Sequence, residues 1–177
     1  MKSVLISIHP KRCGLIASGK KTIEVRKTYP KLPTPFRCYI YCTQDKRLSF
    51  WKSKTYAYAD DRSHNMFDIR GNGKVIGEFV CDLIGLHHST DIPSSCVPVE
   101  ELEKYANGKR LARWHISDVK IYDKPKELGS FWKAGKCPYA AESGCTYEYF
   151  CFRAGQAQRC GETLTRPPQS WCYVDAE

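Results

Sequence analysis

The chain of 177 residues is long enough for one domain with a sizeable core, and its 42% hydrophobic and 27% charged residues are ordinary for a globular protein. No apolar run approaches the ~20 residues of a membrane helix, and the apolar stretch near Met1 is too short for a signal peptide, so we expect a cytoplasmic protein with no membrane partner. Lys and Arg outnumber Asp and Glu by 28 to 19. The net charge of +9 favours a polyanionic partner such as nucleic acid, although a merely basic protein has the same composition.

The first residues predict a strand, a helix and a second strand. Alternating apolar residues over 4–8 indicate the first strand, and Pro10 fits the first turn of a short helix because its missing N–H costs nothing there. Gly19 suits the left-handed position that closes a helix, so the helix precedes it. A second strand follows at 22–27.

The rest of the chain predicts further strands and little helix. A second helix is expected at 98–106 and a helical turn at 125–131, and strands are expected at 36–43, 74–86, 113–122 and 167–175, the last of which closes the fold. Five or six strands, two or three short helices and no βαβ rhythm predict an α+β class that is mostly β. We expect a small closed antiparallel barrel with peripheral helices, in a single domain over 1–177.

Residues 44–73 predict a long excursion without regular structure, because they show no clean periodicity. Cations and aromatic rings alternate in it: Lys46, Arg47, Trp51, Lys52, Lys54, Tyr56, Tyr58, Arg62 and His64. Single-stranded nucleic acid needs that combination, since phosphates bind cations and bases stack on rings. A loop that packs its own rings against the barrel has the same composition, so both interpretations stay open.

Lys21, Glu24 and Arg26 are the most informative polar residues. Glu24 and Arg26 lie two apart on the second strand, so their side chains leave one face and are close enough to pair. An arginine there can hold a phosphate through two nitrogens, and a lysine beside another cation can lose its proton and act as a nucleophile or base. The alternative is a solvent-facing salt bridge on an edge strand.

The spacing G-x-K-x-x-E-x-R, from Gly19 to Arg26 at the first helix-to-strand junction, resembles the signature of the ASCH family, whose domains have a PUA-like barrel fold. The resemblance covers about 1–131 and the closing strand at 167–175. Residues 132–163 then look like a cysteine-rich insertion before that strand.

The resemblance to ASCH domains implies binding of RNA, at a cleft beside the first helix that Lys21, Glu24 and Arg26 would line here. Some small ASCH proteins are amidohydrolases that deacetylate N4-acetylcytidine, and others are linked to ribonuclease activity, so the resemblance also implies Lys21 as a candidate catalytic residue. Glu24 is a second candidate, because its carboxylate could accept a proton or activate water. The amidohydrolase trio is a lysine, a threonine three residues later and a distant glutamate. Lys21 matches the lysine, Glu24 replaces the threonine, and Glu100 or Glu101 matches the glutamate.

Trp114 and Gln169 are further candidates for ligand binding. Trp114 offers a ring on the strand at 113–122, and strand alternation leaves open whether it points inward or outward. Gln169 offers both a donor and an acceptor for the edge of a base, if the closing strand borders the cleft.

Four cysteines lie close together in the insertion: Cys137, Cys145, Cys151 and Cys160. The first three have the spacing C-x7-C-x5-C, which resembles the start of a zinc finger that reads single-stranded RNA, but no histidine follows in the segment. Four thiolates would close a tetrahedral, structural zinc site. The alternative is that these cysteines are unligated and partly buried.

These observations predict a protein that binds RNA or a modified nucleoside through a cationic cleft. A hydrolase of the same fold, either an N4-acetylcytidine-type amidohydrolase or a ribonuclease, is the first alternative, so the sequence leaves open whether the protein is an enzyme. A domain that only mediates protein contacts is the second alternative. No oligomeric state follows from the sequence.

Overall fold

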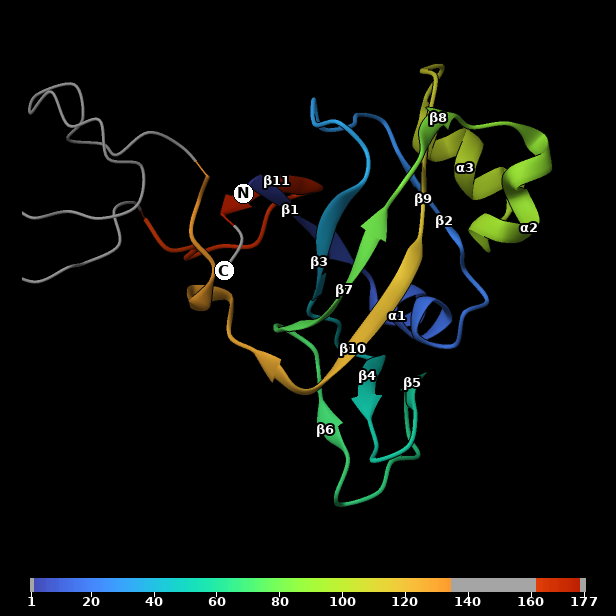
Figure 1. The fold of residues 1–177 in the computed structure, drawn as a ribbon. Coiled ribbons are helices and arrows are strands. Elements are labelled where there is room, and N and C mark those ends of the chain that lie inside the picture. The colour runs from blue at the N-terminus through green and yellow to red at the C-terminus, as the bar shows by residue number, and fades with distance from the viewer. Residues whose placement is uncertain (1, 135–161, 176–177) are drawn as a thin grey trace, which may run out of the picture.

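The computed structural model describes residues 2–134 and 162–175 (Figure 1). The strands are β1 (Lys2–Ile8), β2 (Ile23–Arg26), β3 (Phe36–Cys42), β4 (Ser49–Lys52), β5 (Ala57–Asp60), β6 (Ile69–Arg70), β7 (Val75–Cys81), β8 (Ile84–Leu86), β9 (Ala112–His115), β10 (Ser117–Lys126) and β11 (Trp171–Asp175). The helices are α1 (Pro10–Ala17), α2 (Ile92–Ser95) and α3 (Val99–Ala106), with 3-10 turns η1 (Ser89–Asp91) and η2 (Leu128–Ser130). None of the described helices is long and apolar enough to span a membrane. The four cysteines of the predicted zinc site lie outside the described residues.

Three sheets make up the β part of the molecule. The largest has the strand order β10-β7-β3-β1-β11 and is antiparallel except for the pair β1–β3. That pair is parallel because α1 and β2 lie between its strands in the chain, which gives the chain room to cross over. Two antiparallel sheets of three strands have the orders β2-β9-β8 and β5-β4-β6.

The predicted class, α+β and mostly β with short helices, is confirmed. The predicted closed barrel is not, because each sheet among the described residues has an open strand order. On one side the chain bends from the largest sheet into the β2-β9-β8 sheet after Cys81, at the end of β7. It returns to the largest sheet at Ile116, between β9 and β10. On the other side β2 makes no ladder with β1 or β11. Side-chain hydrogen bonds from Arg26 cross that gap instead.

Both faces of the largest sheet are buried. One face, with Cys38 and Ile40 of β3, belongs to the main core together with Trp114. The opposite face, with Tyr39 and Tyr41, packs against residues from the C-terminal part of the chain. A third cluster lies between the β2 sheet and α3; its members are Ile23, Val25, Val97, Leu102 and Leu111.

The predicted first junction is confirmed. Helix α1 ends at Ala17, and Gly19 adopts a left-handed conformation with a φ of +73°, which a residue with a side chain rarely adopts. The chain then turns into β2, four residues later. This turn places Lys21 directly before a strand that carries Glu24 and Arg26.

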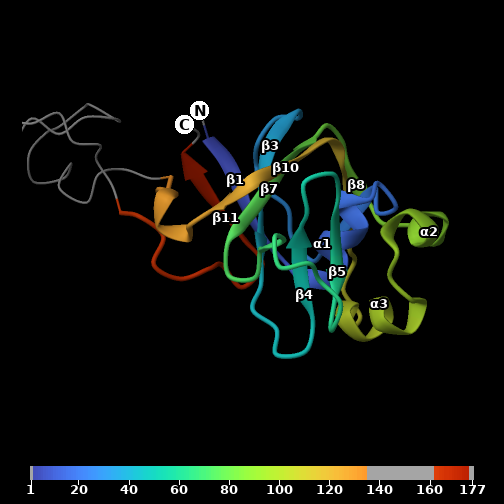
Figure 2. The ribbon, with the colours of Figure 1, turned by 90° about the horizontal axis from the view of Figure 1, so that it is seen from below.

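Residues 44–73 are more regular than predicted, since β4, β5 and β6 form a sheet of their own, which lies beneath α1 (Figures 1 and 2). Phe50 is fully buried in the main core. β5 lies very close to α1: a Cβ on Gly14 would be 2.8 Å from the backbone nitrogen of Ala59 and 2.9 Å from its Cβ. Only small residues on both elements allow this approach.

The chain around the undescribed internal segment is held at both ends. Trp132 pairs with Thr163 in an antiparallel bridge, and Lys133 pairs with Val174 of β11. Phe131 and Leu164 are buried on the second face of the largest sheet. Residues before and after the segment therefore meet on the same part of the fold.

The contact between α1 and β5 makes a testable prediction. Gly14→Val would push a branched side chain into the backbone of β5, so we expect the free energy of unfolding to fall by about 2 kcal/mol or more in urea titrations. Gly129→Val is the matched control, because a Cβ at Gly129 meets nothing within 4 Å, and we expect a change within about 0.5 kcal/mol. Equal stability of the two variants would contradict this packing.

Candidate functional site

The structure brings Lys21, Glu24 and Arg26 together in one buried cluster, whereas the sequence indicated only that Glu24 and Arg26 could pair. The Nζ of Lys21 lies 3.3 Å from Oε2 of Glu24, and the Nε of Arg26 lies 2.9 Å from Oε1 of the same carboxylate. The residues are not a solvent-facing salt bridge, because Lys21 is 1% exposed and Glu24 is 3% exposed. One carboxylate is thus held between two cations inside the protein.

All donors of Lys21 face acceptors. Its Nζ donates to the carbonyl oxygen of Ile23 at 2.7 Å and to that of Ser95 at 2.6 Å, and it forms the ion pair with Glu24. Burial lowers the pKa of Lys21, while the attraction of Glu24 opposes that shift. Three acceptors around one nitrogen stabilise the ammonium form, which has no lone pair for nucleophilic attack.

Glu24 stays ionised although it is buried. Burial alone would raise the pKa of its carboxyl group, but Arg26, Lys21 and Arg12 together outweigh this and hold the pKa below its ordinary value. Oε2 has no hydrogen bond of good geometry, so its contact with Lys21 is an ion pair only. The negative charge of Glu24 is therefore stabilised mainly by electrostatic attraction to the nearby cations Arg26, Lys21 and Arg12.

Arg26 joins three parts of the chain. Its Nη2 donates to the carbonyl oxygen of Ser7 in β1 at 2.6 Å, and its Nη1 donates to Oγ of Ser170 at 3.4 Å. Its side chain is 12% exposed, so it is the one member of the cluster with an appreciable edge at the surface. The guanidinium both spans the gap beside β2 and reaches the surface.

A pocket of about 90 Å³ lies over this cluster. It is lined by Arg12, Lys21, Glu24, Val25, Arg26, Val97, Glu101, Leu102 and Tyr105. An ion pair between Arg12 of α1 and Glu101 of α3 joins the two helices across it, and the ammonium of Lys27 lies 4.9 Å from the ring centre of Tyr105. The volume suits a small planar group or an anion rather than a folded polymer.

The two other predicted ligand residues do not line this pocket. Trp114 is fully buried, with its ring in edge contact with Phe36 and Trp171. It lies opposite Glu24 in the β2–β9 ladder and belongs to the main core. Gln169 is exposed and lies outside the pocket lining.

Several residues of the site were not predicted. Arg12 and Tyr105 line the pocket, and the backbone oxygens of Ser7 and Ser95 accept the hydrogen bonds of the two cations. One feature of the sequence could have indicated Arg12: the helix that carries it has no acidic residue and ends shortly before Lys21. Ser95 lies in α2, which has four residues and too few positions for a helical period.

No group of three or more potential metal ligands occurs within residues 2–134 and 162–175. The six cysteines with described surroundings are all free, and four of them, Cys13, Cys38, Cys42 and Cys81, are buried. Burial raises the pKa of the Cys38 thiol well above its ordinary value, so that group stays protonated. These four therefore behave as core residues.

Replacing the buried carboxylate tests the cluster. Glu24→Gln leaves Lys21 and Arg26 without a counter-charge, so we expect the free energy of unfolding to fall by about 3–5 kcal/mol. Glu101→Gln removes a carboxylate whose side chain is 54% exposed, and we expect a loss below about 1 kcal/mol. Urea titrations measure both, and equal losses would contradict the assignment.

The effect of Glu24→Gln should depend on pH. Because the folded-state pKa of Glu24 is lowered, its stabilisation is present above the ordinary pKa of 4.5 and is lost as the pH falls through the folded-state pKa. The difference in unfolding free energy between wild type and variant therefore shrinks toward acid pH.

Comparisons with known proteins place the fold. No protein-family model matches the sequence, and neither does any curated protein. A crystal structure of an ASCH protein from Zymomonas mobilis is similar, with a TM-score of 0.57 and 17% sequence identity over 98% of this chain and 87% of that chain. Structures of its Tyr-to-Phe and Ser-to-Ala variants match with TM-scores of 0.55 and 17% identity, over 99% and 98% of this chain and 91% and 88% of theirs. The resemblance inferred from residues 19–26 is thus supported independently by shape: the chain has the fold of an ASCH domain.

Proposed function

We propose that the protein binds RNA or a modified nucleoside at the pocket over Lys21, Glu24 and Arg26. The observation that carries this proposal is the excess of cations around one buried carboxylate at the base of a small pocket. Three cations, Arg12, Lys21 and Arg26, and two carboxylates, Glu24 and Glu101, line it. Their positive balance favours an anionic ligand.

The shape of the pocket also suits a piece of a nucleotide. Tyr105 is 37% exposed and offers a ring for stacking, while the exposed edge of Arg26 can bind an oxygen of a phosphate or a base. A volume of about 90 Å³ accepts one such group, so the rest of an RNA strand would lie across the mouth of the pocket. The ASCH-type fold agrees with this kind of partner.

Hydrolysis at this pocket is the weaker alternative. A nucleophilic Lys21 would need a neutral amine with access to substrate, whereas its nitrogen is buried and faces three acceptors. Glu24 is held by two cations and has almost no surface to meet a water. Both residues fit better as a buried support that positions Arg26 than as the chemical groups of an N4-acetylcytidine amidohydrolase or a ribonuclease.

Binding of a labelled single-stranded RNA, measured by fluorescence anisotropy at several salt concentrations, tests the proposed site. Arg12→Ala should weaken binding about three- to tenfold and reduce the slope of log affinity against log salt by about 1. Arg110→Ala removes an exposed arginine outside the pocket and is the matched control, expected to change little.

Two results of this titration would count against the proposed site. An equal effect of Arg12→Ala and Arg110→Ala would indicate general charge attraction. No binding by the wild type at low salt, together with no product released from acetylated cytidine, would leave a domain for protein contacts as the remaining interpretation.

A structural zinc ion on Cys137, Cys145, Cys151 and Cys160 is a separate prediction, which rests on the sequence. Protein purified without added zinc should contain about one zinc ion per chain by mass spectrometric metal analysis. Cys145→Ser should lower that content, whereas Cys13→Ser, at a buried core position, should not. Metal-free wild-type protein would contradict the site.

A further inference from the structure

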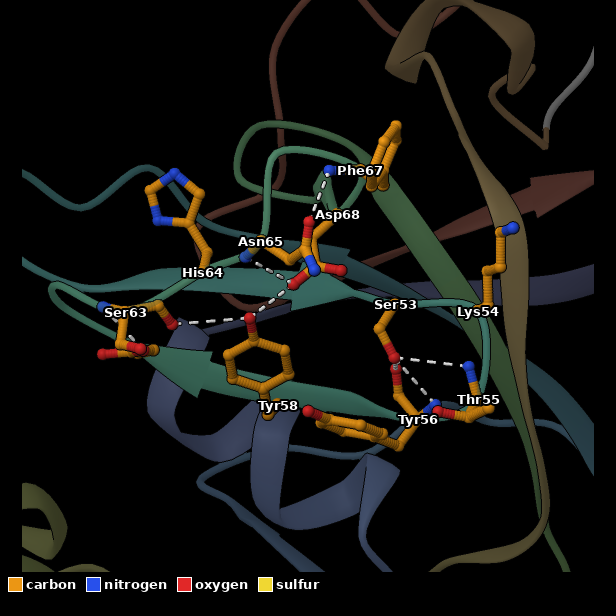
Figure 3. Close-up of a pocket in the computed structure, with 11 residues that line it drawn as sticks. Ser53, Lys54, Thr55, Tyr56, Tyr58, Ser63, His64, Asn65, Phe67 and Asp68 are labelled. Carbon is orange, nitrogen blue, oxygen red and sulfur yellow. Dashed lines mark hydrogen bonds between the residues drawn. The ribbon is translucent and has the colours of Figure 1, made fainter.

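The outer face of the small β5-β4-β6 sheet carries an open hollow of about 720 Å³. We call it the aromatic hollow; its rings are Tyr56, Tyr58, His64 and Phe67. Figure 3 shows Tyr58 on β5 and Tyr56 just before that strand, with Phe67 and His64 on the connection above them and Lys54 at the rim. The proposed pocket uses none of these residues.

Packing of the fold does not explain these rings. In the sequence Tyr56-Ala57-Tyr58-Ala59, the alanines occupy the face toward α1 and the core, so the tyrosines lie on the opposite face. Tyr56 is 63% exposed and Phe67 is 72% exposed. Large rings left in water at adjoining positions are typical of a binding surface.

The hollow is held in shape by short-range hydrogen bonds. The hydroxyl of Tyr58 donates to Asp68 at 2.6 Å, and the Oγ of Ser53 accepts from the backbone nitrogen of Tyr56 at 3.0 Å. Asp60 accepts from two backbone N–H groups of the following turn. Asp60 and Asp68 both line the hollow, and both accept hydrogen bonds from the loop. These two carboxylates therefore hold the loop in shape.

Two cations lie at or beside these rings, and the carboxylates of Asp60 and Asp68 also line the hollow. Lys54 lines the hollow and has no ion-pair partner among the described residues. Arg70 is exposed on β6 directly opposite Trp51, and the ring of Trp51 stacks on His64 with centroids 3.8 Å apart. Exposed rings with cations beside them bind bases and phosphates of a flexible strand, because every base has a face to stack.

Helix α1 separates the hollow from the proposed pocket. β5 packs on one side of α1, and Arg12 of the same helix lines the pocket with β2 and α3 (Figures 1 and 2). α1 carries Lys11 and Arg12 and no acidic residue. The charged side chains of α1 are therefore all positive, which favours a strand of nucleic acid that crosses this helix.

We propose that the aromatic hollow is a second binding surface for single-stranded nucleic acid, where bases stack on Tyr56 and Phe67. The inference rests on the proposed function, because it extends an RNA strand from the pocket across α1. It implies that a longer RNA binds more tightly than a short one. The residues of the hollow should contribute only to this gain in affinity, and not to binding of the short RNA.

Two labelled RNAs of mixed sequence, of about 4 and about 12 nucleotides, separate the two surfaces in anisotropy titrations. The double variant Tyr56→Ala/Phe67→Ala should bind the longer RNA at least about fivefold more weakly than wild type and the shorter one equally well. Neither side chain is buried, so the variant should fold, which its melting temperature verifies. Met66→Ala is the matched control, since Met66 is 85% exposed in the same loop but has no ring.

The outcomes are distinguishable. If the double variant binds the longer RNA as wild type does, while Arg12→Ala weakens both RNAs, the second surface is wrong and the proposed function stands. If Met66→Ala weakens binding as much as the double variant, unspecific apolar contact replaces stacking and the proposal is again overturned. If wild type binds neither RNA, the proposed function itself fails, and the inference fails with it.

Discussion

The charge of Glu24 is the constraint on which the candidate site depends. A carboxylate removed from water is very unfavourable unless cations and hydrogen bonds replace the lost hydration. Lys21 and Arg26 provide that replacement, and their remaining donors bind the backbone oxygens of Ser7 and Ser95. One buried negative charge thus fixes the position of segments that are far apart in the sequence.

Within the cluster, Lys21 and Glu24 differ from Arg26 in what they can do. Lys21 and Glu24 are almost entirely inside, so they determine where Arg26 lies, and Arg26 presents its edge to the pocket. A solvent-exposed arginine loses conformational freedom when it binds a ligand. An arginine already held by Glu24 and Ser7 has lost that freedom on folding, which supports the ligand-binding role proposed for Arg26.

Local features of the sequence could be predicted well. The helix end at Gly19, the following strand and the pairing of Glu24 with Arg26 all depend on neighbours within a few residues. The burial of that pair could not be predicted, because it comes from α2 and α3, some 70 positions later. For the same reason alternation alone could not decide that Trp114 points into the core.

The sequence indicates the open strand order and the small β5-β4-β6 sheet only weakly. β4 and β5 have four residues each and β6 has two, which is too short for a visible period, so 44–73 resembled a loop. The barrel prediction assumed that sequential strands pair by backbone ladders all the way round. Between β2 and β1, a guanidinium takes the place of a ladder.

The bridges of Trp132 with Thr163 and of Lys133 with Val174 have a consequence for how this protein can vary. They clamp the chain on both sides of the segment 135–161, on the face of the large sheet away from the main core. Doubling the length of a flexible loop between fixed ends costs only about 0.6 kcal/mol of closure entropy. The chain between these two bridges can therefore be replaced or lengthened at little cost to the stability of the fold, and the charged cluster around Glu24 keeps its geometry.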